Sequence, residues 1–138
     1  MAFPTSGGGY QFTDGNLNEP KIGVQQDPAV VTAAATLTAA QILTGLLIVS
    51  TAATTTNQAY TLPTVASLEA ALVNPKPNST IEFVVINLGT SSGTATMTTN
   101  TGWTVGATQG AVAVAVTASG RFLGRKTGDG AWTLYRIA

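Results

Sequence analysis

The side chains in this chain that could do acid-base chemistry are its carboxylates, because its 138 residues include no histidine and no cysteine. Without imidazole or thiol groups, the chain has no Ser-His or Cys-His nucleophile pair, no disulfide, and no metal site of the histidine or cysteine type. Two carboxylates facing each other across a cleft would still suffice to hydrolyse a glycosidic bond. Between residues 29 and 138, the candidates for such a pair are Glu69, Glu82 and Asp129.

Structural roles explain two of these carboxylates better than catalysis does. Asp129 precedes Gly130 in the sequence TGDG, which is typical of a tight hairpin turn. Glu69 lies beside, and not within, the apolar stripe of a helix predicted over residues 64–74. That position is typical of a side chain on a solvated helix face.

The third carboxylate, Glu82, lies near the start of a predicted strand, on the face that carries Val84 and Ile86. We expect it to be partly buried and paired with Arg121 or Arg125. A structural ion pair is favoured over a catalytic acid, so the chain is not expected to be an enzyme.

Two motifs near the N-terminus suggest ligand sites only weakly. Gly7 to Gly9 are not followed by the Gly-Lys-Ser/Thr of a phosphate-binding loop, so a flexible arm explains them better. Asp14 to Asn16, with Asn18 and Glu19, form the densest group of side-chain oxygens, but they lack the periodic spacing of a calcium loop. We therefore expect no cofactor and no metal.

Basic and aromatic residues alternate near the C-terminus, where Trp132 and Tyr135 accompany Arg121, Arg125, Lys126 and Arg136. Such a group can clamp and stack a single-stranded nucleic acid, or it can border a subunit interface, where Trp, Tyr and Arg are enriched. Six basic residues balance six acidic ones, so no net charge attracts nucleic acid. An interface is favoured, and a nucleic-acid partner is not expected. Trp103 and Trp132 suit either the core or a glycan-stacking platform, and we favour the core.

Charged residues make up only 9% of the chain, whereas about a quarter is typical of soluble domains. The surface is therefore expected to be covered in an assembly or to be solvated by hydroxyl groups. The most apolar stretch, Ile42 to Val49, is far shorter than the roughly 18 residues of a membrane helix, so no membrane partner is expected. No basic residue precedes Lys21, which argues against a secretory signal.

Local patterns predict a mainly β fold with two short helices. TAAQ at 38–41 can form a capping box for the first helix, and Thr64 can cap the second, in which Val65, Leu68 and Leu72 form the apolar stripe. The predicted strands are 46–52, 58–62, 80–89, 94–99, 103–105, 111–117, 121–126 and 131–138. Short strands separated by glycine-marked turns indicate an antiparallel β-sandwich or small barrel, preceded by an extended arm.

Five of these predicted strands carry further expectations. Strands 46–52 and 80–89 are apolar on both faces, so we expect them to be buried at the centre of packed sheets. The segments 94–99 and 103–105 are expected to pair as a hairpin. The strand 111–117 places alanines on one face, where small side chains permit close contact with another subunit. The predicted subunit interface consists of Ala111, Ala113, Ala115, Arg121, Arg125, Trp132 and Tyr135.

Four motifs give the chain a family resemblance over residues 36–138. TAAQILTG at 38–45, TLPT at 61–64, FVVIN at 83–87 and GAWTLYRI at 130–137 resemble those of capsid decoration, or cement, proteins of tailed bacteriophages. The resemblance implies a protein made in the host cytoplasm that binds the major capsid protein on the outer surface of the phage head, as a homotrimer. Related modules occur at the ends of tail fibres, so a tail-fibre or baseplate module that binds host-surface glycan is the alternative.

Residues 1–28 lie outside this resemblance and precede the predicted β-rich domain at 29–138. An extended chain of this length can reach a neighbouring molecule, and apolar side chains recur along it. The predicted capsid-binding anchors are Phe3, Tyr10, Phe12, Leu17, Ile22 and Val24. The alternative is a terminal segment without a role.

Overall fold

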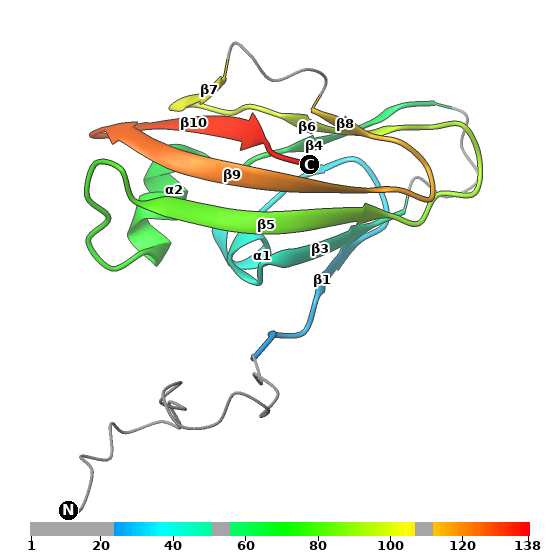
Figure 1. The fold of residues 1–138 in the computed structure, drawn as a ribbon, viewed down its shortest axis with the longest axis horizontal. Coiled ribbons are helices and arrows are strands. Elements are labelled where there is room, and N and C mark those ends of the chain that lie inside the picture. The colour runs from blue at the N-terminus through cyan, green and yellow to red at the C-terminus, as the bar shows by residue number, and fades with distance from the viewer. Residues whose placement is uncertain (1–23, 51–55, 107–111) are drawn as a thin grey trace, which may run out of the picture.

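The computed structural model of the chain describes residues 24–50, 56–106 and 112–138. These residues form two layers of β-sheet and two short helices (Figure 1). The predicted mainly β, sandwich-like fold with two helices is therefore confirmed.

The larger layer, sheet A, has six strands, and the smaller layer, sheet B, has four. In spatial order, sheet A contains β1 (Ala29–Val31), β3 (Leu46–Val49), β5 (Thr80–Asn87), β9 (Ser119–Gly128), β10 (Ala131–Arg136) and β7 (Trp103–Val105). Sheet B contains β2 (Ala35–Thr36), β4 (Gln58–Thr61), β6 (Ala95–Thr98) and β8 (Ala113–Val114). The sequence patterns had not indicated the short edge strands β1 and β2.

Strand directions differ from the expected antiparallel arrangement. From β1 to β6 the chain alternates between the two sheets, so that β1, β3 and β5 are parallel neighbours in sheet A, and β2, β4 and β6 are parallel neighbours in sheet B. Antiparallel pairing occurs between β5 and β9, between β9 and β10, and between β6 and β8. The sheets are mixed because, in the first half, the chain adds one strand to the other sheet before it adds the next strand to the same sheet.

Two helices make the return from sheet B to sheet A: α1 (Ala39–Leu43) connects β2 to β3, and α2 (Val65–Ala71) connects β4 to β5. The predicted capping box is confirmed, because the Thr38 hydroxyl accepts from the Gln41 amide at 3.2 Å while the Gln41 side chain accepts from the Thr38 amide at 2.8 Å. Thr64 caps α2 in the same sense by accepting from the Ser67 amide. Local hydrogen bonds thus fix the position at which each helix begins.

The core lies between the sheets and contains both tryptophans, as expected. Trp132 is fully buried, Trp103 is 6% exposed, and their ring centroids are 5.9 Å apart. The Trp103 indole also donates a 2.9 Å hydrogen bond to the carbonyl of Pro63, which satisfies its buried N–H group. Phe83 and Phe122 stack at 5.5 Å across the β5–β9 pair.

The predicted hairpin of 94–99 with 103–105 is wrong, because β6 belongs to sheet B and β7 to sheet A. The chain changes sheets at Gly102, whose φ of +88° favours glycine, and a Cβ atom there would lie 2.6 Å from the carbonyl oxygen of Gly130. The predicted strand 111–117 is also shorter than expected. Only Ala113–Val114 pairs as a strand, and Thr117 adopts a left-handed φ of +57°.

Candidate functional site

The outer face of sheet A brings together three of the predicted site residues, Arg121, Arg125 and Tyr135. Side chains on a strand alternate between faces, and Leu47, Val49, Phe83 and Val85 point into the core with at most 1% exposure. Their neighbours in the chain point outward. We define the apolar half-face as the outward apolar side chains of β1, β3 and β5, namely Val30, Leu46, Ile48, Val84 and Ile86; Thr80 and Glu82 lie on the same face of β5, nearer its start.

Strand pairing makes the apolar half-face continuous. Val30 pairs with Ile48, which pairs with Ile86, so these side chains form one row across three strands. Leu46 and Val84 form the adjacent row. Val30 is 61% exposed, and the other four side chains are partly exposed. Figure 1 shows the strands of sheet A side by side, with β4, β6 and β8 in a second layer.

This half-face corrects the expectation that residues 46–52 and 80–89 are covered on both faces. Their inner side chains are buried as predicted, but the outer ones keep solvent access within the described part of the chain. Parallel strands are normally covered on both faces, and soluble monomers rarely leave large contiguous apolar patches exposed. The half-face therefore has the properties of a contact surface.

The β9 and β10 side of the same face is polar and contains three of the predicted interface residues. Arg121 pairs with Glu82 at 2.8 Å, so the predicted ion pair is confirmed, although both side chains are exposed rather than partly buried. Arg125 donates to the Asn78 side chain at 3.2 Å. Tyr135 lies over the position of Gly106, where a Cβ atom would be 2.6 Å from the tyrosine ring.

Other members of the predicted interface lie elsewhere. Trp132 is a core residue with no exposed surface, so it cannot contribute to a contact between subunits. Ala113 lies in sheet B, where its carbonyl accepts a hydrogen bond from Arg136, and Ala115 follows β8 at the surface. Ala111 lies outside the described residues. The alanines and the arginines therefore do not share one face.

Glu69 belongs to a polar cluster around the buried Lys126 ammonium, and its own side chain is only 23% exposed, so the prediction of a solvated helix face is wrong. Its carboxylate accepts from Lys126 Nζ at 2.5 Å and from Trp132 Nε1 at 3.0 Å. The Lys126 side chain is only 5% exposed, and its second acidic neighbour, Asp129, is 3.7 Å away. The alternation of Phe122, Gly124 and Lys126 on β9 was the available sequence signal, since it places the lysine on the inward face.

The Glu69 cluster makes stability depend on pH in a defined direction. The hydrogen bond from Lys126, followed by that from Trp132, lowers the pKa of Glu69 below its ordinary value. This stabilisation is fully present above the ordinary carboxyl pKa and is lost as pH falls through the lowered pKa. We expect the wild-type melting temperature to fall more steeply in acid than that of Glu69→Gln, as measured by circular dichroism. Parallel curves for the two proteins would contradict the assignment.

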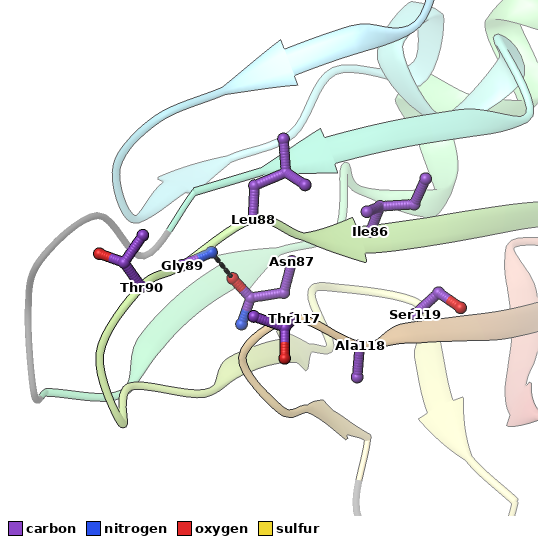
Figure 2. Close-up of a pocket in the computed structure, with 8 residues that line it drawn as sticks. All are labelled: Ile86, Asn87, Leu88, Gly89, Thr90, Thr117, Ala118 and Ser119. Carbon is purple, nitrogen blue, oxygen red and sulfur yellow. Dashed lines mark hydrogen bonds between the residues drawn. The ribbon is translucent and has the colours of Figure 1, made fainter.

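An open hollow of about 410 Å³ lies at the end of β5, next to the apolar half-face (Figure 2). Asn87 is its buried polar residue: its side-chain oxygen accepts from the Gly89 amide at 2.9 Å, and its amide group donates to the carbonyl of Val114 at 3.1 Å. Asn87 thus holds the loop in place. Leu88, which is 56% exposed, extends the apolar surface into the hollow. The lining residues are Ile86, Asn87, Leu88, Gly89, Thr90, Thr117, Ala118 and Ser119.

The predicted arm is described only from Val24 onward, and the anchors Phe3, Tyr10, Phe12, Leu17 and Ile22 lie outside the described residues. The weak calcium-site candidate at 14–19 lies there too. Across 24–50, 56–106 and 112–138, the acidic side chains form no group of three or more that could hold a metal ion. No helix in those ranges is long and apolar enough to cross a membrane.

The turn predicted at Asp129-Gly130 is confirmed between β9 and β10, so Asp129 has the structural position expected for it. Gly130 adopts a φ of +66°, and the pairing register shifts between Ala131 and Trp132, a combination found in short hairpins with a bulge.

The apolar half-face makes the outer face of sheet A the candidate site. No protein-family model, curated protein or solved structure matches this chain.

Proposed function

We propose that this chain is a structural protein of a phage virion, which binds the outer surface of the head and ties neighbouring capsomers together. The observation that carries the proposal is the apolar half-face on a chain of which only 9% is charged. When a partner covers such a surface, the free energy falls by roughly 25 cal/mol for each Å² of apolar area removed from water. The resemblance of residues 36–138 to capsid decoration proteins supports the phage head as the setting.

The positions of the carboxylates support a structural role over a catalytic one. Glu69 is held by Lys126 and Trp132, and Glu82 is paired with Arg121. Asp129 lies in a two-residue turn. Retaining and inverting glycosidases need a pair of carboxylates facing a common cleft. Glu69, Glu82 and Asp129 are accounted for by these structural positions instead.

The proposed partner is the major capsid protein, and the proposed assembly is a homotrimer on the outer surface of the head. Arg121, Arg125 and Tyr135 on the polar side of sheet A supply the residue types that are enriched at subunit contacts. Neither a cofactor, a nucleic acid nor a membrane is part of the proposal. The glycan-binding alternative gains no support from the two tryptophans, because both are buried and cannot stack on a sugar.

The test is to add the purified protein to phage particles assembled without it and to image both samples by electron cryo-microscopy. We expect added density on the head surface. Because the proposed contact is mainly apolar, the bound fraction should change little when the salt concentration is raised. Density at the tail tip would establish the tail-fibre or baseplate alternative. Release by salt alone would mean that charged side chains hold the protein in place.

A further inference from the structure

The N-terminal segment enters the domain at one corner of the apolar half-face. The Gln25 side chain donates a 2.6 Å hydrogen bond to the carbonyl of Thr44, two residues before Leu46 begins β3. Three residues after Gln25 the chain reaches Pro28, and it then forms β1, the edge strand of the same half-face. The described part of the segment therefore passes close to the start of β3 before it enters β1.

The described end of this segment packs little against its own domain. Residues 24–28 are all exposed, and the Val24 side chain keeps 98% of its exposure. If the segment folded back onto the half-face of its own copy, Val24 would be expected to lose part of that exposure to the adjoining strands. The exposure of Val24 thus favours a binding target for the segment on another molecule.

Length and composition match residues 1–23 to the half-face of a second copy. A fully extended chain spans about 3.3 Å per residue, so the segment is much longer than the eight residues of β5. Its charged residues are only Asp14, Glu19 and Lys21. Apolar side chains recur along the segment at Phe3, Tyr10, Phe12, Leu17 and Ile22. An extended segment of this kind can place successive apolar side chains on a sheet surface.

We infer that residues 1–23 of one copy bind the apolar half-face of a second copy. This gives the arm a target within the protein's own assembly, in place of the capsid surface that its length and spaced apolar side chains had suggested. The contact covers Val30, Ile48 and Ile86, the row with the most exposed member. The inference bears on the proposed function, because the half-face is also the surface proposed to meet the head: residues 1–23 would cover it in the free assembly, and the capsid protein would have to displace them.

A matched pair of valine substitutions tests the half-face. Val30→Asp places a charge on the face, whereas Val73→Asp makes the same change at a valine that is 99% exposed and follows α2. Ile48→Thr is a second face variant that keeps a β-branched side chain. Molar mass is measured by light scattering over a range of concentrations, and circular dichroism checks that each variant is folded. We expect Val30→Asp and Ile48→Thr to weaken association at least about tenfold, and Val73→Asp to match wild type. Association of both face variants at wild-type strength, or a wild type that stays monomeric, would overturn the inference.

Cysteine crosslinking identifies the occupant of the half-face, and the absence of native cysteine makes each introduced thiol unique. Two differently tagged full-length copies are mixed, one carrying Phe12→Cys and the other Ile48→Cys, and a short bis-maleimide is added. We expect a crosslinked product that contains both tags. Val73→Cys in place of Ile48→Cys should give none. A chain carrying both Phe12→Cys and Ile48→Cys that crosslinks only within itself would disprove exchange between copies. Capture of Phe12→Cys by the capsid protein alone would disprove the inference while supporting the proposed function.

Discussion

Replacing Glu69 with alanine is expected to lower the free energy of unfolding by about 3 kcal/mol, because it leaves the buried Lys126 ammonium without its main partner. Lys126 has a side-chain exposure of only 5%, so water cannot readily replace the lost carboxylate. The Trp132 N–H group loses its acceptor in the same substitution. The effect stays at the lower end of the range for buried pairs, because the Asp129 carboxylate is 3.7 Å from Lys126 Nζ. Urea unfolding at neutral pH measures the change.

Glu82→Ala is the matched control for this prediction. It removes a carboxylate at a similar distance from its basic partner, but Glu82 and Arg121 are 43% and 54% exposed. Exposed ion pairs contribute about 0–1 kcal/mol, so this variant should unfold near the wild-type urea concentration. Equal losses for Glu69→Ala and Glu82→Ala would mean that burial of Lys126 does not determine the energy of the cluster.

Deleting residues 1–28 is expected to leave the melting temperature nearly unchanged and to weaken attachment to phage heads by at least about a hundredfold. The buried core extends from Leu37 to Leu134, so the deletion removes none of its members. Attachment weakens because subunits that no longer associate through the arm lose multivalent binding. Competition with labelled full-length protein for the same heads measures the loss.

Smaller changes within the arm should reproduce part of this effect. Tyr10→Ala combined with Phe12→Ala removes two of the predicted aromatic anchors and keeps the chain length. We expect its attachment to be intermediate between those of the full chain and the deletion. If the deleted protein competes for heads as well as the full chain does, the arm has no part in attachment.

Features set by neighbouring residues could be predicted from the sequence. The Thr38 capping box depends on Gln41, three residues away, and the turn at Asp129-Gly130 depends on glycine conformation. Strands β4, β5 and β7 also lie where their apolar patterns placed them. The mainly β class followed from these local signals together.

Features set by distant partners could not be predicted in the same way. The alternating pattern of β6 would be the same whether the strand paired with the next strand in the chain or, as it does, with β4, from which it is separated by a strand of the other sheet. Glu69 is 57 residues from Lys126, so the sequence of the helix gives no sign that Glu69 pairs with this lysine. A strand that is apolar on both faces has the same sequence pattern whether its second face is covered by the same chain or by a partner. This ambiguity left the half-face, the main part of the candidate site, undetected.

The passage of the chain from one sheet to the other also constrains the order in which the protein folds. The β9–β10 hairpin closes through a two-residue turn, so it can form early at little cost in loop entropy. The parallel pairs β1–β3 and β3–β5 join strands that are separated in the chain by a strand of sheet B. Such non-local pairings are slow. On a ribosome, β5 and β6 would emerge before their partners β9 and β8, so the N-terminal half of the sandwich depends on synthesis of the C-terminal half for its completion.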